Sequence, residues 1–271
     1  MTLDKILAYC NYIASKEIEG RSMTIEQFNT VIDVVNIELF NFEWTKLEMA
    51  ATQSNQPLAR LFYSSSILRP FKMLSQFSLI GTFGRYTLPA DYAHYIIVAA
   101  DYNGSIREVD ILTDKEMIAR RGSVMHKNLS LYPAGVIYDT FLQMYPKDIQ
   151  DIEFTYLRNP VIPFYDHCIE TLTANDWYMP VGSYIQWNGP QNRYDLYTVG
   201  GALIIAGVTH AHYNGLSGQP NYISLSVEFE WEERVHIILE QLILEKMGIN
   251  LQSEQIQRYN AQKSAQQQNQ M

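Results

Sequence analysis

The sequence predicts a mixed α+β fold, in which helices at both ends of the chain pack together and antiparallel strands fill the middle. Near both ends, apolar residues recur every three or four positions, the period of an amphipathic helix. In the middle, short runs of aromatic and β-branched residues are separated by Gly and Pro, as in antiparallel sheets. Strands and helices do not alternate along the chain and no internal repeat is evident, so a parallel sheet is not expected.

The first two elements are predicted to be helices. Residues 3–16 carry one apolar stripe, formed by Leu3, Ile6, Leu7, Cys10 and Ile13. A longer helix follows, because Thr24 and Gln27 have the spacing of a capping box and no Gly or Pro interrupts the chain from there to Gln56.

The second helix contains three aromatic rings at alternate positions, Phe40, Phe42 and Trp44. Rings of this kind are more often part of the core than of a partner surface. All three cannot face one side of a helix, so at least one should lie outside the core stripe. That ring is a candidate contact with another subunit.

The central region is predicted to contain two pairs of antiparallel strands. Residues 93–102 form a strand-like run that ends at an Asn-Gly turn, so residues 105–112 should return as its hairpin partner. Residues 135–146 alternate imperfectly and are followed, after a short polar turn, by residues 151–160. We expect these last two segments to pair with each other.

Two further helices have recognisable ends. Thr113 and Glu116 again have capping-box spacing, which predicts a short helix closed by Gly122. Residues 226–251 contain the apolar stripe of a terminal helix, with Gly248 where a left-handed cap belongs.

These elements predict one structural unit with five regions. They are a helical region (1–75), a β-rich core with a short helix (76–160), a Tyr- and Gly-rich β insertion (161–225), a C-terminal helix (226–251) and a Gln-rich tail (252–271). The tail has few large apolar residues, so we expect it to fray or to be ordered only by a partner.

The composition favours a protein that contacts other proteins rather than one that binds nucleic acid. The net charge is −9, whereas phosphate binding needs clustered Lys and Arg. An acidic wall would instead repel the DNA backbone and let a duplex pass. Only 18% of the residues are charged and 19 are Tyr, which suits either a buried interface or a β-rich core.

The two cysteines, Cys10 and Cys168, support neither a disulfide framework nor a four-ligand zinc site. A reducing compartment is the simpler expectation. The first residues do not resemble a secretion signal, and no run approaches the ~18 apolar residues of a membrane span.

Few residues have the arrangement of a catalytic site. His210 and His212 would share one face of a strand and could hold a metal, but no third ligand accompanies them, so structural or surface roles are favoured. His167 is the neighbour of Cys168, yet a thiol nucleophile needs its base across a fold.

Two charged clusters have alternative explanations. Glu228, Glu230, Glu232 and Glu233 resemble paired catalytic carboxylates, but the preference for acids in a first helical turn explains them better. Arg120 and Arg121 either contact phosphate or a neighbour's carboxylate, or simply occupy the last turn of a helix. We expect no catalytic residue, metal or cofactor in this chain, and therefore no enzymatic activity.

The sequence resembles the head-to-tail connector proteins of tailed bacteriophages, the adaptor or ring proteins below the portal, and most of all the ring proteins of crAss-like gut phages. The likeness covers about residues 86–160 and 226–252. It is carried by the segments "YTLPADYAHYIIVAADYNG", "REVDILTDKEMIARRGS", "YPAGVIYDTFLQMYP", "DIEFTYLRNP" and "FEWEERVHIILEQLILEKMGINL".

The resemblance implies a virion protein, made in the cytoplasm of a bacterial host, that forms a closed homo-oligomeric ring, commonly a dodecamer. The ring would bind the portal protein and other tail or ring proteins, without any membrane, and DNA would pass through it without sequence-specific binding. We expect Trp231, Gln255 and Tyr259 to face another chain, and Arg120 and Arg121 to be further interaction residues.

Two other functions remain open. A carbohydrate- or receptor-binding module of the virion would use the aromatic segment 164–220, where Trp177 or Trp187 would stack on a sugar. A metal-dependent hydrolase would be centred on His210 and His212.

Overall fold

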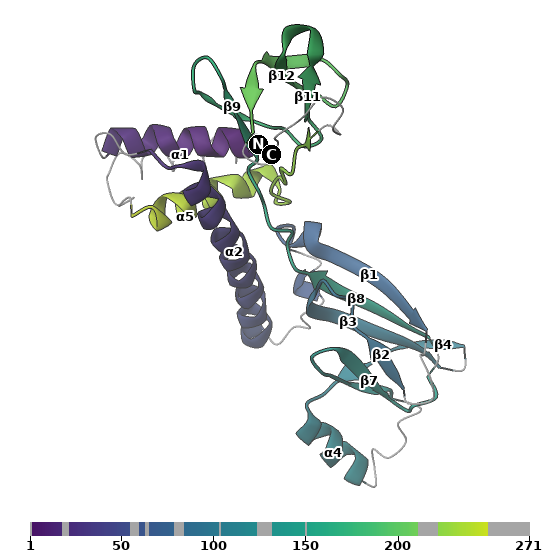
Figure 1. Ribbon diagram of the computed structural model, residues 1–271. Coiled ribbons are helices and arrows are strands. Elements are labelled where there is room, and N and C mark those ends of the chain that lie inside the picture. Colours follow the sequence, from purple (N-terminus) through teal and green to yellow (C-terminus); the bar gives the residue numbers. More distant parts are fainter. Residues whose placement is uncertain are drawn as a thin grey trace. The chain divides into compact units, whose positions relative to one another are not determined.

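The computed structural model confirms the mixed α+β fold: the N-terminal helices contact the C-terminal helix, and the middle of the sequence forms mostly antiparallel sheets (Figure 1). It describes residues 2–17, 22–54, 60–62, 65–78, 84–102, 104–123, 132–149, 151–210 and 222–248. The chain forms two compact units. Unit 1 comprises residues 1–41 and 160–271, and unit 2 comprises residues 42–159.

This division differs from the single structural unit expected from the sequence. One boundary falls inside a continuous helix, and the other falls at Pro160, two residues after a central strand ends. Neither boundary is marked by a linker. Unit 1 is formed by contacts between two segments that are far apart in the sequence, and local composition does not reveal such contacts.

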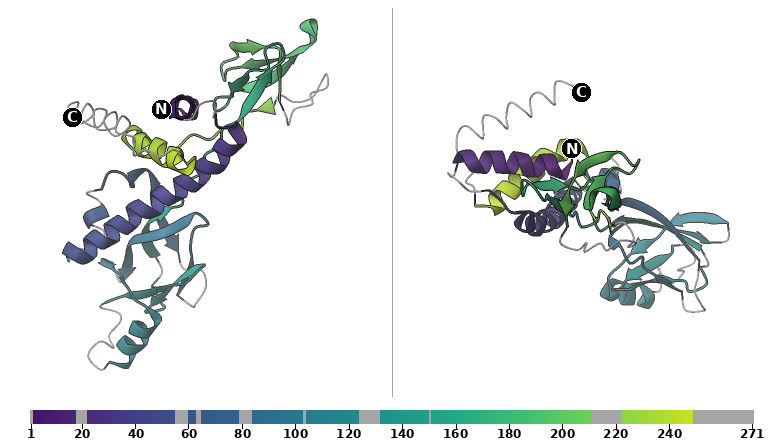
Figure 2. Two further views of the ribbon diagram at one scale, coloured as in Figure 1. Left: turned by 90° about the vertical axis from the view of Figure 1, so that its left-hand side faces the viewer. Right: turned by 45° about the horizontal axis from the view of Figure 1, so that its top comes forward.

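The helices of unit 1 are α1 (Leu3–Glu17), the first part of α2 (Ile25–Ser54) and α5 (His236–Lys246), preceded by the 3-10 turn η3 (Glu233–Val235). The predicted capping box of α2 is present: the Thr24 N–H donates to Gln27 Oε1 at 3.1 Å, and the Gln27 N–H donates to Thr24 Oγ1 at 3.3 Å. α1 and α5 lie side by side in Figures 1 and 2, and their buried apolar residues include Leu3, Ile6, Cys10, Leu239 and Ile243.

The C-terminal helix starts later than predicted, at His236 rather than near residue 226. The residues before η3 are extended, because Val227 pairs with Phe164 in an isolated antiparallel bridge. The predicted left-handed residue at the other end is confirmed, since Gly248 has φ of 74°.

Unit 1 also contains two small antiparallel sheets. Sheet C has the order β10-β9-β14, with β10 at Asp176–Tyr178, β9 at His167–Glu170 and β14 at Val208–Thr209. Sheet D has the order β13-β12-β11-β15, with β13 at Leu203–Ala206, β12 at Arg193–Tyr197, β11 at Tyr184–Asn188 and β15 at Tyr222–Ile223; the 3-10 turn η2 (Gly189–Gln191) joins β11 to β12. A shared apolar core joins the two sheets through Cys168, Met179, Ile185, Leu196 and Val208.

Unit 2 is built on two four-stranded sheets. Sheet A has the order β1-β8-β3-β4, with β1 at Lys72–Ser78, β8 at Asp151–Arg158, β3 at Tyr92–Tyr102 and β4 at Ser105–Glu108; the 3-10 turn η1 (Arg69–Phe71) precedes β1. Sheet B has the order β2-β7-β6-β5, with β2 at Arg85–Thr87, β7 at Phe141–Tyr145, β6 at Ala134–Ile137 and β5 at Asp110–Ile111. The predicted hairpin of β3 and β4 is confirmed, with Gly104 in its turn at φ 76°.

The expected pairing of residues 135–146 with residues 151–160 is wrong. The first segment is itself a hairpin, in which β6 and β7 pair around a turn at Asp139 and Thr140. The second segment, β8, pairs instead with β1 and β3. The imperfect alternation of residues 135–146 reflects the turn in its middle, which lacks the Gly that usually marks one.

The two sheets of unit 2 pack face to face, and the helix α4 (Asp114–Gly122) covers the far side of sheet B. The core between the sheets includes Tyr86, Val98, Leu142, Met144 and Phe154. On the other face of sheet B, Met117 of α4 packs against Ala134 and Val136. Figure 1 shows sheet B between sheet A and α4. No helix in the described part of the chain combines the length and hydropathy of a membrane span.

Candidate interaction surfaces

Glu228 holds two elements of unit 1 together through hydrogen bonds and is not a solvated residue of a first helical turn. Its Oε2 accepts from the Leu3 N–H at 2.8 Å, and its Oε1 accepts from the Tyr178 hydroxyl at 2.5 Å. The Tyr178 ring lies against Tyr165, whose hydroxyl donates to Asp4 Oδ1 at 3.2 Å. Burial, together with these carboxylates, raises the pKa of both tyrosines. The carboxylate of Glu228 therefore ties the start of α1 to sheet C.

Two of its neighbours are also engaged inside unit 1. Glu230 Oε2 accepts from the Val161 N–H at 2.9 Å, and Glu232 pairs with Arg234 at 2.7 Å. Because α5 begins only at His236, the interpretation of these acids as first-turn residues is wrong for Glu228 and Glu230. They belong to an extended segment that crosses the unit.

Trp231 does not present its ring to another chain. It is 4% exposed, and its indole N–H donates to Asn36 Oδ1 at 2.7 Å. The Asn36 amide in turn donates to the Val161 carbonyl at 3.0 Å. The expected contact role of Trp231 is thus corrected, since the fold of unit 1 already uses both its ring and its N–H. Gln255 and Tyr259 lie outside the described residues.

Asp166 is the centre of a buried polar network in unit 1. His210 Nε2–H donates to Asp166 Oδ1 at 2.8 Å, and the Tyr222 hydroxyl and the Leu225 N–H donate to Oδ2 at 3.0 and 2.9 Å. Burial alone would raise the pKa of Asp166, but the bonds from His210, Leu225 and Tyr222 hold it below its usual value. His210 is therefore a partner of a carboxylate in the core.

The structure gives the histidine and cysteine candidates little chemical support. His212 lies outside the described residues, and within those residues no group of three or more His, Cys, Asp or Glu is arranged to hold a metal ion. Burial raises the pKa of both Cys10 and Cys168 to about 12. Neither thiol is thus in the thiolate form that a nucleophile requires at neutral pH.

Arg120 makes contacts within unit 2, and its expected role as an interaction residue stays a prediction. Its guanidinium donates to Asp110 Oδ2 at 2.7 Å and to the Tyr132 carbonyl at 2.9 Å, which fastens the end of α4 to β5. Arg121 is exposed, with its guanidinium 5.4 Å from the centre of the Tyr145 ring. Of the two arginines, Arg121 is the one at the surface.

The exposed side of α4 combines cationic and apolar residues. The predicted capping box of Thr113 and Glu116 is present and fixes the start of the helix. Ile118 is 72% exposed, with Lys115 and Arg121 three positions before and after it. Ile118 is thus a large apolar side chain exposed between two cationic residues on this helix.

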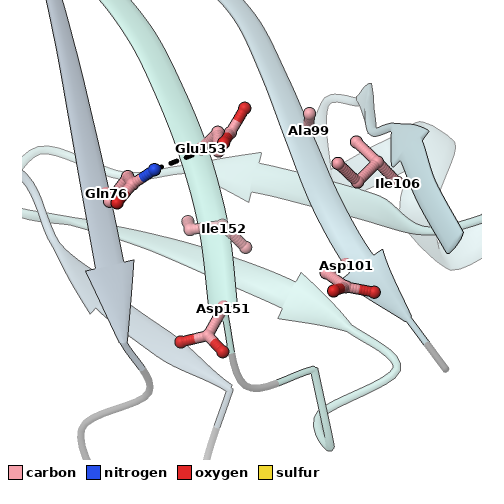
Figure 3. Close-up of a pocket in the computed structure, with 7 residues that line it drawn as sticks. All are labelled: Gln76, Ala99, Asp101, Ile106, Asp151, Ile152 and Glu153. Carbon is pink, nitrogen blue, oxygen red and sulfur yellow. Dashed lines mark hydrogen bonds between the residues drawn. The ribbon is translucent and has the colours of Figure 1, made fainter. Parts of the chain in front are cut away.

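The outer face of sheet A carries acids around a shallow pocket of about 220 Å³ (Figure 3). It is lined by Gln76, Ala99, Asp101, Ile106, Asp151, Ile152 and Glu153. In the strand register Asp101 stands opposite both Asp151 and Ile106, and Ile106 is 70% exposed. This face was not predicted, although the period-two spacing of Asp151 and Glu153 in "DIEF" would have placed both on one side of a strand.

Two further groups of aromatic residues are candidates for contact with other molecules. Phe42 is the ring of the second helix that lies outside the core, with 64% of its surface exposed, whereas Phe40 and Trp44 are buried. On sheet D, Tyr184 stacks on Tyr197 with ring centres 5.5 Å apart.

No protein-family model matches the chain, and comparison with curated proteins gave no match.

Proposed function

We propose that the chain is a structural subunit of a bacteriophage connector ring, which joins the portal of the capsid to the tail and surrounds the DNA channel. The observation that carries the proposal is the number of large apolar side chains displayed on regular elements of unit 2. Leu74, Ile106 and Ile118 are all more than 60% exposed although they lie on paired strands or on a capped helix. Exposed apolar side chains at such separate positions are candidates for the apolar centres of several contacts with other proteins.

The other supports are the sequence resemblance and the charge. The resemblance extends over residues 86–160 and 226–252, which form most of unit 2 and the segment around α5. The net charge of −9 suits a wall past which DNA moves without adhering. As in the family that the chain resembles, the partners would be further copies of the chain, commonly twelve in all, the portal protein and other tail or ring proteins.

The direct test is native mass spectrometry of the purified chain, alone and mixed with the portal protein of the same phage. We expect a closed homo-oligomer, by itself or seated on the portal, with a mass that is a multiple of 31.3 kDa. A chain that stays monomeric at every concentration and ignores the portal contradicts the proposal.

A carbohydrate-binding module of the virion is the second candidate, favoured by one face of sheet D. There the stacked Tyr184 and Tyr197 share the face with Asn188 and Arg193, which both bind the buried Asp195. Aromatic rings beside polar groups are what sugar sites use. Isothermal titration calorimetry with a set of glycans tests it. Saturable heat that Tyr184→Ala abolishes supports this function, and the absence of saturable heat for every glycan removes it.

A further inference from the structure

The outer face of sheet A is built to receive a cationic partner. The register places Asp101 opposite Asp151 on β8, and Glu153 opposite Ala99 on β3. Carboxylates side by side on neighbouring strands repel each other, and a cation placed over them relieves that repulsion. Ile106 is exposed on the neighbouring edge strand β4, so the face offers an apolar side chain next to three acids. Figure 3 shows Asp101, Asp151 and Ile106 around one shallow pocket.

The exposed side of α4 has the complementary character. Ile118 supplies an apolar side chain, and Lys115 and Arg121 flank it with positive charge. The acids of the same helix are engaged locally: Asp114 Oδ1 accepts from the Tyr138 hydroxyl at 2.7 Å, and Glu116 belongs to the capping box. The helix therefore displays an isoleucine between two cations.

The two surfaces lie on opposite sides of unit 2. Met117 fixes α4 to one face of sheet B, and the core of unit 2 joins the other face of sheet B to the inner face of sheet A. The acidic pocket is on the outer face of sheet A. A contact between the two surfaces thus joins different patches of two copies, and repetition of such a contact generates a ring when the rotation closes.

We propose that α4 of one copy docks on the outer face of sheet A of the next copy. Ile118 lies against Ile106, and Lys115 and Arg121 face Asp101 and Glu153. This inference rests on the proposed connector ring and names the contact between its neighbouring subunits. A stable interface buries about 800 Å² per partner, so this docking is the anchor of a larger contact.

Disulfide trapping tests the contact. Two single variants, Ile106→Cys and Ile118→Cys, are prepared with different mass tags, mixed, assembled with or without the portal protein, and mildly oxidised. Both positions are highly exposed, so folding should be unaffected, and the native Cys10 and Cys168 are buried. We expect a mixed disulfide dimer with both tags. The control mixture pairs Ile118→Cys with Val199→Cys, which places a thiol at an exposed position of unit 1 and should give no such dimer.

Charge reversal supplies an independent readout. Asp101→Lys with Glu153→Lys, or Lys115→Glu with Arg121→Glu, should raise the protein concentration needed for assembly at least about tenfold, since like charges then meet. Mixing the two double variants should restore mixed dimers, because each carries the complement of the other.

The outcomes separate the two proposals. Oligomers that form without the mixed disulfide, and that tolerate the charge reversals, overturn this contact and leave the ring proposal standing. Absence of any oligomer, with or without the portal, overturns both.

Discussion

Two acids of unit 1, Asp166 and Glu228, and two acids of unit 2, Asp101 and Glu153, are used in opposite ways. In unit 1, Asp166 and Glu228 accept hydrogen bonds from donors far away in the sequence and sit within the packed structure. In unit 2, Asp101 and Glu153 stand exposed on the outer face of a sheet. The negative charge of the chain therefore has two roles: some carboxylates hold the fold together, and others are exposed to solvent or to a partner.

The sharpest test of this contrast is Asp166→Ala. It leaves the buried donor of His210 and the part-buried donors of Tyr222 and Leu225 without their acceptor, and we expect the free energy of unfolding to fall by about 3–5 kcal/mol. Urea denaturation measures it. The matched control Asp176→Ala removes an exposed carboxylate of the neighbouring strand and should cost no more than about 0.5 kcal/mol. Equal losses in the two variants would contradict the distinction.

The same carboxylate should make unit 1 sensitive to acid. The pKa of Asp166 in the folded protein lies below its usual value of 3.8, so its stabilising effect is complete above pH 3.8 and is lost as the pH falls through the lower folded-state pKa. We expect the urea midpoint to drop in that acidic window. Asp166→Ala should flatten this part of the profile, and an unchanged slope in the variant would show that other groups cause it.

Glu228→Gln should have the next largest effect. An amide cannot accept from both the Leu3 N–H and the Tyr178 hydroxyl through its two ends, so one buried donor loses its partner at a cost of about 1–3 kcal/mol. Glu233→Gln, five positions further on and exposed, is the control. Thermal unfolding measures the stability of both variants. A midpoint for Glu233→Gln that is lower than that for Glu228→Gln would contradict the stabilising role of Glu228.

Thr113→Ala should weaken unit 2 by about 1 kcal/mol, because it removes the side-chain acceptor that caps α4. Thr113→Ser keeps the hydroxyl and should retain most of the stability. Hydrogen exchange of the α4 amides measures the local effect. Equal protection in the two variants would mean that packing of Met117, and not the cap, holds the helix.

The smallest effect on stability is expected for Asp101→Asn. Removing one of two carboxylates that face each other across strands should stabilise the isolated chain by a few tenths of a kcal/mol. The same change should weaken assembly, which sedimentation at several concentrations detects. A clear loss of monomer stability would show that Asp101 stabilises the fold, as Asp166 and Glu228 do, and would contradict the difference between the two pairs of acids.

The parts of the fold that were predicted from sequence are those that local residues determine. The pairs Thr24 with Gln27 and Thr113 with Glu116 fix helix starts within one turn of chain, and Gly104 and Gly248 mark positions with positive φ. These signals need no knowledge of distant residues.

The errors concern contacts between distant segments. Strand β8 pairs with β1 and β3 across separations that periodicity does not encode, and Trp231 is buried through a bond to Asn36, 195 positions away. The acidic face of sheet A was missed for the same reason, because Asp101 and Asp151 become neighbours only through the register of β3 and β8. Sequence patterns indicate which residues share a face of one element, but not which element lies beside it.

The most direct test of the proposed connector ring is electron cryomicroscopy of the portal region of a phage particle whose genome encodes this chain. We expect a closed ring between portal and tail whose subunits fit units 1 and 2 as separate bodies, with sheet A of each copy against α4 of its neighbour. Density for the chain elsewhere in the particle, or a connector whose subunits match neither unit, would contradict it.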